Sequence, residues 1–111
     1  LDYVEQDLTV NVNTGRHRLL MSDEKSLIAK GQSSPAILTN TSLTNLLDNL
    51  GDIFFEVTGS GSWSAGVDLW LSKGDDTLDV LSVPSNPGSS TFRTTTSVHA
   101  GLGDDTLVVS L

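Results

Sequence analysis

Apolar and polar residues alternate along several short stretches of the chain, a period-2 pattern typical of half-buried β-strands. Segments rich in Gly, Ser, Asn and Pro separate these stretches and predict turns and loops, notably over 22–35 and 83–90. The pattern as a whole predicts an all-β protein. Strands are expected over residues 7–12, 18–21, 36–38, 52–57, 67–71, 77–81 and 106–109.

One strand-forming segment recurs. The sequence Gly-Asp-Asp-Thr-Leu-Asp-Val at 74–80 returns 29 residues later, at 103–109, as Gly-Asp-Asp-Thr-Leu-Val-Val. Fainter copies align on Gly51 and Gly15, with apolar residues alternating on both sides of each glycine corner. A strand–corner–strand unit cannot bury its apolar face alone, and stacked units bury it together. We therefore expect a right-handed parallel β-helix (β-solenoid) of about four coils, forming one module over residues 1–111.

Two features leave alternatives open. An antiparallel β-sandwich with Gly-Asp hairpins also fits the strand pattern, although it gives no reason for the repeat. Leu43, Leu46, Leu47 and Leu50 have the i, i+3, i+4, i+7 spacing of a helix, which predicts a short helix over 42–50 beside the solenoid. The competing interpretation turns these leucines inward around a coil corner.

The paired carboxylates of the repeat are the candidate chemistry. Stacked copies place Asp75 and Asp76 beside Asp104 and Asp105, where like charges repel and a hard cation can neutralise them. The alternative is an Asp-Asp-Thr turn in which the carboxylates accept backbone N–H groups and the threonine closes the turn. This second arrangement requires no metal.

Residues 100–108, Ala-Gly-Leu-Gly-Asp-Asp-Thr-Leu-Val, resemble the nonapeptide G-G-x-G-x-D-x-U-x of RTX, haemolysin-type calcium-binding repeats. The resemblance implies calcium as a cofactor, with Asp76 and Asp105 as ligands and Gly74 and Gly103 shaping the turns. One motif per 29 residues is more similar to the Gly-Asp-Asp-Thr tandem repeats of large surface proteins. That similarity implies a structural or adhesive role.

Composition narrows the partners. With 14 acidic and 6 basic residues the chain has a formal charge of −8, which argues against nucleic acid and against docking on an anionic membrane. The sequence has no apolar stretch long enough for membrane insertion. The absence of cysteine excludes disulfides and thiolate metal sites. The abundance of Ser, Thr, Asn and Gly is typical of secreted β-rich fibres and favours an extracellular or cell-surface location.

We do not expect an enzyme. His17 and His99 are the only histidines, and the sequence has no nucleophile elbow, zincin helix or phosphate-binding loop. Asp and Glu pairs serve polysaccharide-degrading β-helix enzymes, which remain an alternative of another class. Such enzymes usually have a longer helix with a carved groove.

Three aromatic residues indicate an assembly surface. Trp70 lies between two inward-facing leucines and should face outward, as should Phe54, and Trp63 is expected to cover the apolar seam. Stacking of Trp63 and Trp70 on sugars gives a second function, a carbohydrate-binding module. Asn40 begins an Asn-Thr-Ser glycosylation sequon.

The sequence thus predicts a structural module of an extracellular fibre, surface layer or adhesin. Strand-like residues lie at both ends of the sequence, and exposed strand edges recruit further strands. The expected partners are other copies of the chain or adjacent repeats, joined end to end and stiffened by calcium. The chain is then either one module of a longer array or the protomer of a filament.

Overall fold

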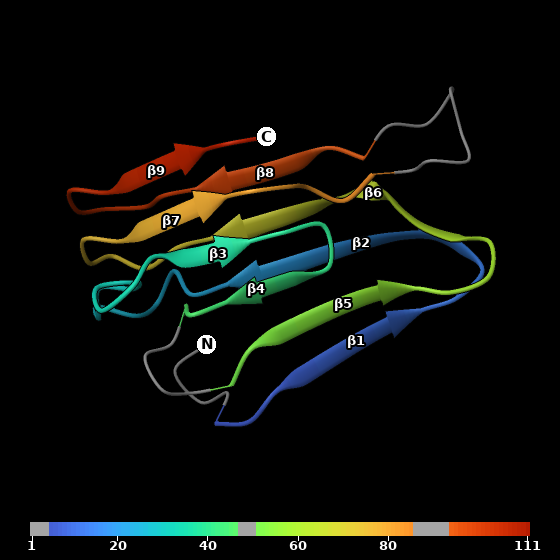
Figure 1. The fold of residues 1–111 in the computed structure, drawn as a ribbon, viewed down its shortest axis with the longest axis horizontal. Helices are drawn as coiled ribbons and strands as arrows, with labels where there is room; N and C mark the ends of the chain where they lie inside the picture. The colour runs from blue at the N-terminus through green and yellow to red at the C-terminus, as the bar shows by residue number, and fades with distance from the viewer. Residues whose placement is uncertain (1–4, 47–50, 86–93) are drawn as a thin grey trace.

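The computed structural model describes residues 5–46, 51–85 and 94–111, and within these ranges it contains strands but no helix (Figure 1). None of these segments forms a helix long and apolar enough to cross a membrane. The nine strands follow the chain in this order: β1 (Leu8–Val12), β2 (Gly15–Ser22), β3 (Ala36–Leu38), β4 (Ser42–Thr44), β5 (Ile53–Val57), β6 (Gly61–Trp70), β7 (Thr77–Val80), β8 (Thr96–His99) and β9 (Thr106–Val109).

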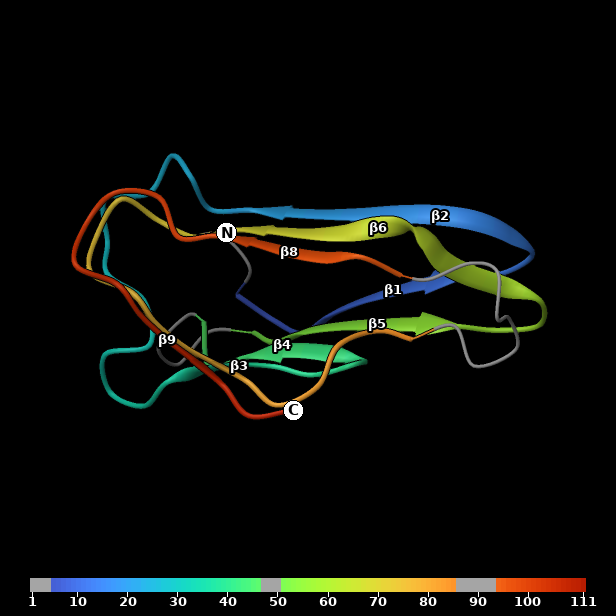
Figure 2. The same cartoon turned by 90° about the horizontal axis from the view of Figure 1, so that it is seen from above.

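The strands form two sheets that face each other as two layers (Figure 2). The larger sheet has the order β1-β5-β4-β3-β7-β9 and the smaller one the order β2-β6-β8, with all of its strands parallel. The chain passes from one layer to the other after each of β1, β2, β5, β6, β7 and β8, whereas β3, β4 and β5 follow one another within the larger sheet. Long-range pairing therefore builds most of the fold.

Alternating apolar side chains fill the space between the layers, as the sequence pattern predicts. Phe55 is fully buried, and its ring meets that of Trp63 edge to face, with 6.4 Å between the ring centroids. The smaller sheet contributes Leu19, Met21, Val67 and Leu69 to this core, and the larger sheet contributes Ala36, Leu38, Ile53, Leu78 and Val80.

The 29-residue repeat is confirmed as a structural register. β7 pairs in parallel with β9, so that Leu78 lies opposite Leu107, and β6 pairs in parallel with β8, so that Leu69 lies opposite Val98. The fainter copy at Gly15 does not have the expected register. Its Leu19 lies opposite Val67 rather than at the position of Leu78.

The prediction of a parallel β-helix of about four coils is wrong. Among the described residues, the larger sheet is mixed and no closed coils form, because the chain turns back after β3 and β4 runs antiparallel to both β3 and β5. Side chains hold this reversal in place. The Ser42 N–H donates to Thr39 Oγ1 at 3.0 Å, and the two hydroxyls lie 2.8 Å apart.

The predicted helix over 42–50 is also contradicted where the structure describes it. Residues Ser42–Thr44 form β4, whose neighbourhood is fixed by backbone bonds such as that from the Phe55 N–H to the Thr41 carbonyl at 2.8 Å. Leu43 and Leu46 are buried, as the competing interpretation required. Leu47 and Leu50 lie outside the described residues. Leucine spacing alone did not distinguish a helix from a short buried strand.

The core position of Phe55 gives a direct test of the two-layer packing. We expect Phe55→Ala to lower the free energy of unfolding by about 3–5 kcal/mol, because it removes a fully buried ring and leaves a cavity. Phe54→Ala is the matched control, since this neighbouring ring is only half-buried, and it should cost about 1 kcal/mol. Urea unfolding measures both. Equal losses would contradict the inward placement of Phe55.

Candidate functional site: the stacked Gly-Asp-Asp-Thr corners

The two corners of the repeat lie one above the other at the same edge of the two layers (Figure 2). The first, residues 71–76, joins β6 to β7, and the second, residues 100–105, joins β8 to β9. Backbone bonds connect them: the Leu71 N–H donates to the His99 carbonyl, and the Thr106 N–H donates to the Asp76 carbonyl, both at 2.8 Å.

A third segment, residues 23–35, lies against the other side of the first corner, although it has no Gly-Asp-Asp-Thr sequence. The Lys73 N–H donates to the Ser26 carbonyl and the Thr77 N–H donates to the Lys30 carbonyl, each at 2.9 Å. The first corner therefore has segment 23–35 on one side and the second corner on the other. Among the described residues, the second corner has a stacked neighbour on one side only.

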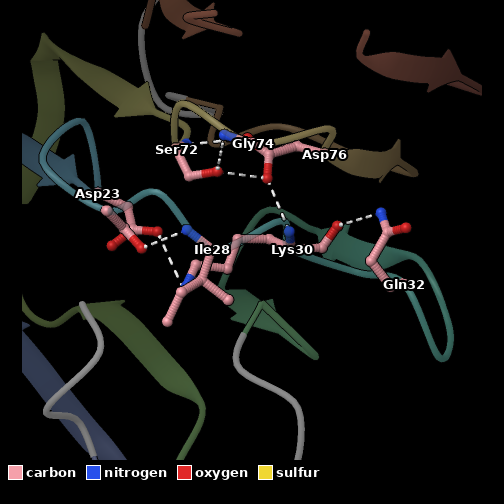
Figure 3. A network of polar contacts seen from close by, with 8 residues as sticks. Asp23, Ile28, Lys30, Gln32, Ser72, Gly74 and Asp76 are labelled. Carbon is pink, nitrogen blue, oxygen red and sulfur yellow. Dashed lines mark hydrogen bonds and ion pairs between the residues drawn. The ribbon is translucent and has the colours of Figure 1, made fainter. Parts of the chain in front are cut away.

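Asp76 is the buried centre of this stack, with 1% of its surface exposed (Figure 3). Its Oδ1 accepts the Lys30 N–H and the Ser72 hydroxyl, both at 2.7 Å, and its Oδ2 accepts the Ser72 N–H at 2.8 Å. The Ser72 hydroxyl oxygen in turn accepts the Gly74 N–H at 3.0 Å. A buried carboxylate with this set of donors fixes the corner to the segment beneath it.

The two aspartates of the first corner bond in opposite directions along the stack, and the second aspartate of the other corner follows the same pattern. The second aspartate bonds to the preceding layer, since Asp76 accepts the Lys30 N–H and Asp105 Oδ1 accepts the Asp76 N–H at 2.9 Å. The first aspartate bonds to the following layer, since Asp75 Oδ1 accepts the Asp104 N–H, also at 2.9 Å. The paired carboxylates therefore act as reciprocal clamps between layers.

Glycine allows these layers to approach closely. A Cβ on Gly103 would lie 2.5 Å from the Gly74 carbonyl oxygen, and the backbone of Gly103 has a φ of +109°, which side chains rarely adopt. A Cβ on Gly74 would lie 2.6 Å from the Ala29 nitrogen. The expectation that Gly74 and Gly103 shape the turns thus has a steric basis in the contact between layers.

A buried ion pair connected to this network involves Lys30, a residue that the sequence pattern did not single out. Lys30 is buried, and its Nζ lies 3.4 Å from Asp23 Oδ2, which is buried as well (Figure 3). The same lysine gives its backbone N–H to Asp76, 46 residues away in sequence. Gln32 adds a bond from its side-chain amide to the Asp75 carbonyl at 2.6 Å. The one nearby feature of the sequence that could have indicated these bonds is Ser72, four residues before Asp76.

Protein donors already occupy two of the corner carboxylates. Ca²⁺ takes about six to eight oxygen ligands, whereas Asp76 accepts three hydrogen bonds from the protein and Asp105 accepts a backbone N–H. Within the described ranges, no three or more His, Cys, Asp or Glu residues gather in a way that could hold a metal ion. The contacts match the alternative expectation, in which the carboxylates bind backbone N–H groups.

The three aromatic residues expected on one surface lie in three different places. Trp63 is a core residue with 3% of its surface exposed. Trp70 lies on the outer face of the smaller sheet, 36% exposed, with its ring stacked on that of His99 at a centroid distance of 3.9 Å. Phe54 is half-buried on the outer face of the larger sheet. No joint seam of Phe54 and Trp70 forms, nor a flat sugar platform of Trp63 and Trp70.

Polar residues surround the Trp70–His99 stack. Asp68 accepts a bond from Arg18 Nε at 2.8 Å, and its other oxygen lies 4.0 Å from His99 Nε2. Asn40 is exposed in the turn between β3 and β4, where its N–H donates to the Ser82 hydroxyl at 2.9 Å. The sequon therefore lies on a surface turn.

Comparison of the chain with protein-family models, with curated proteins and with solved structures finds no match. The contacts of the corners and the exposed strand edges are therefore the features that bear on function.

Removing the Asp76 carboxylate tests its central place in the stack. We expect Asp76→Ala to cost about 3 kcal/mol or more in the free energy of unfolding, because the buried N–H groups of Ser72 and Lys30 lose their acceptor. Asp104→Ala is the control in the exposed position of the other corner, expected to cost under about 0.5 kcal/mol. Chemical denaturation of both variants checks this. Similar costs would show that Asp76 is an ordinary surface aspartate.

Two glycine substitutions separate backbone strain from close approach. Gly66 has a φ of +114°, similar to that of Gly103, but a Cβ there meets its nearest atom, the Thr95 carbonyl oxygen, at 3.7 Å. We expect Gly66→Ala to cost about 1 kcal/mol from strain alone and Gly103→Ala to cost at least about 1 kcal/mol more. Thermal unfolding compares the two. Equal losses would rule out the tight contact between Gly103 and Gly74.

Proposed function

We propose that this chain is a structural module of an extracellular fibre, surface layer or adhesin, and that it assembles through an open strand edge. The observation that carries the proposal is the exposed β9 strand at the end of the larger sheet. The stacked corners supply the rigidity that such a module needs. The Ser- and Thr-rich composition supports the extracellular location.

β9 offers both backbone and apolar groups to a partner. All four of its residues are exposed, including Leu107 at 39% and Val109 at 63%. The N–H groups of Thr106 and Ser110 are bonded to the β7 side, so the alternation of a strand turns those of Leu107 and Val109 toward the free edge. An edge of this kind is a template for another strand.

The sequence of β9 lacks the usual protection of an edge strand. Soluble proteins commonly place lysine, proline or a bulge on an exposed edge to prevent pairing, whereas β9 reads Thr-Leu-Val-Val. The opposite edge, β1, also exposes Leu8. The net charge of −8 keeps the molecules apart until specific contacts form. An unprotected apolar edge on an acidic module favours controlled assembly over a solitary role.

Sedimentation velocity and negative-stain imaging over a concentration series test the proposal. We expect association that increases with protein concentration, and Val108→Lys should suppress it at least about tenfold, because it introduces a charge at the edge. Leu27→Lys is the matched control on an exposed loop and should leave assembly unchanged. A chain that remains monomeric at every concentration contradicts the proposal.

The same samples, with added calcium or excess chelator, test whether assembly needs the metal. We expect no change in sedimentation or in melting temperature, because the Asp76 and Asp105 carboxylates already bind backbone N–H groups. A melting temperature that rises with calcium and falls in chelator would restore calcium as a structural cofactor of the corners.

A further inference from the structure

We propose that the β8–β9 edge binds a strand–corner–strand unit of another polypeptide whose corner carries the sequence Gly-Asp-Asp-Thr. This inference rests on the proposed function and specifies the partner of that assembly. It follows from the contacts between the two corners of the chain itself, where one such unit already lies on another (Figure 1).

The polar contacts between the existing layers define what the incoming corner must supply. Asp75 Oδ1 accepts the N–H of Asp104, and the N–H of Asp76 donates to Asp105 Oδ1. At the outer corner the equivalent groups are the Asp104 carboxylate and the Asp105 N–H. The Asp104 carboxylate is placed to accept a backbone N–H of an added unit. The Asp105 N–H is placed to donate to a carboxylate of that unit. An incoming Asp-Asp pair provides both partners in one register.

Shape adds a second requirement. Gly103 fits over the Gly74 carbonyl only because it has no Cβ. The residue that lies over the Gly103 carbonyl in a further layer meets the same constraint, so the partner needs glycine directly before its Asp-Asp pair. Glycine and two aspartates in this order are a narrow specification, which a generic β-strand does not meet.

The apolar contacts continue in the same way. Leu78 and Val80 are buried, and they lie opposite Leu107 and Val109 in the parallel register of β7 and β9. Leu107 and Val109 have the same inward orientation but are exposed at the edge of the sheet. A strand with apolar residues at the two matching positions would cover them, as β9 covers β7.

A second copy of the chain does not offer this unit from its opposite end. There the larger sheet ends in β1, and β1 connects to β2 through Asn-Thr-Gly at 13–15. This turn lies at the opposite end of the strands from the Gly-Asp-Asp-Thr corners (Figure 2). Stacking a copy by its β1 end would place no aspartate pair over Asp104 and Asp105. The complementary partner is the repeat unit itself.

Hydrogen exchange with a synthetic peptide tests the inference on the intact chain. The peptide has the sequence of residues 94–111, which includes one complete strand–corner–strand unit. Amide exchange of the labelled protein is followed by NMR with and without the peptide. We expect exchange of the Leu107 and Val109 amides to slow at least about tenfold, while Thr106 and Ser110, already bonded to the β7 side, stay unchanged.

Matched controls make the readout specific. A peptide with Gly103→Ala should protect neither amide, because its Cβ would collide with the Gly103 carbonyl of the protein. Asp104→Ala in the protein should weaken the protection by the unaltered peptide, whereas Glu24→Ala, which removes an exposed carboxylate far from the edge, should not. Thermal unfolding of each protein variant confirms that it is folded before the peptide is added.

Two results would overturn the inference. The first is no protection at Leu107 and Val109, and the second is equal protection by the Gly103→Ala peptide. The protein is kept below the concentration at which it self-associates in sedimentation, so that the protection measured comes from the peptide. The proposed function is judged separately by sedimentation. Association that Val108→Lys suppresses would uphold assembly even where the peptide fails to bind.

Discussion

The carboxylate of Asp76 is the interaction on which the arrangement of the corners depends. It is buried between the first corner and segment 23–35, and it accepts bonds from both. Because a buried carboxylate is costly without donors, the geometry around it is tightly specified. The stacking of β7 on β3, and of the second corner on the first, extends from this fixed point.

The paired aspartates reconcile an acidic repeat with close stacking. Like charges placed directly above one another repel, and the sequence alone therefore suggested a cation. The structure instead gives Asp75 and Asp105 to backbone N–H groups of the adjacent layer, 29 residues away in each case. Each added layer brings donors along with its charges, so that the polar groups of the backbone and the carboxylates satisfy each other.

The sequence predicted the parts of the fold that follow from local pattern and repetition. The register of Leu78 on Leu107 was visible in the repeat, and the strands at 36–38 and 106–109 have the expected bounds. The hairpin after β3 was not predicted, because hydroxyl bonds between Thr39 and Ser42 decide it. The different roles of Asp75 and Asp76 could not be predicted either, because the burial of Asp76 depends on a hydrogen bond from the Lys30 N–H, which is distant in sequence.

The β3–β4 hairpin gives the molecule two unlike ends. Beyond it β4 pairs antiparallel with β5, and β5 pairs in parallel with β1, whereas on the other side β3, β7 and β9 keep a uniform parallel direction. A unit added to β9 repeats the Gly-Asp-Asp-Thr corner that precedes it. A unit added to β1 does not, because β1 and β5 connect to the smaller sheet at the opposite end of the strands (Figure 2). Growth of the proposed assembly would therefore be vectorial, because the hairpin ends the repeating register on one side, as a cap does.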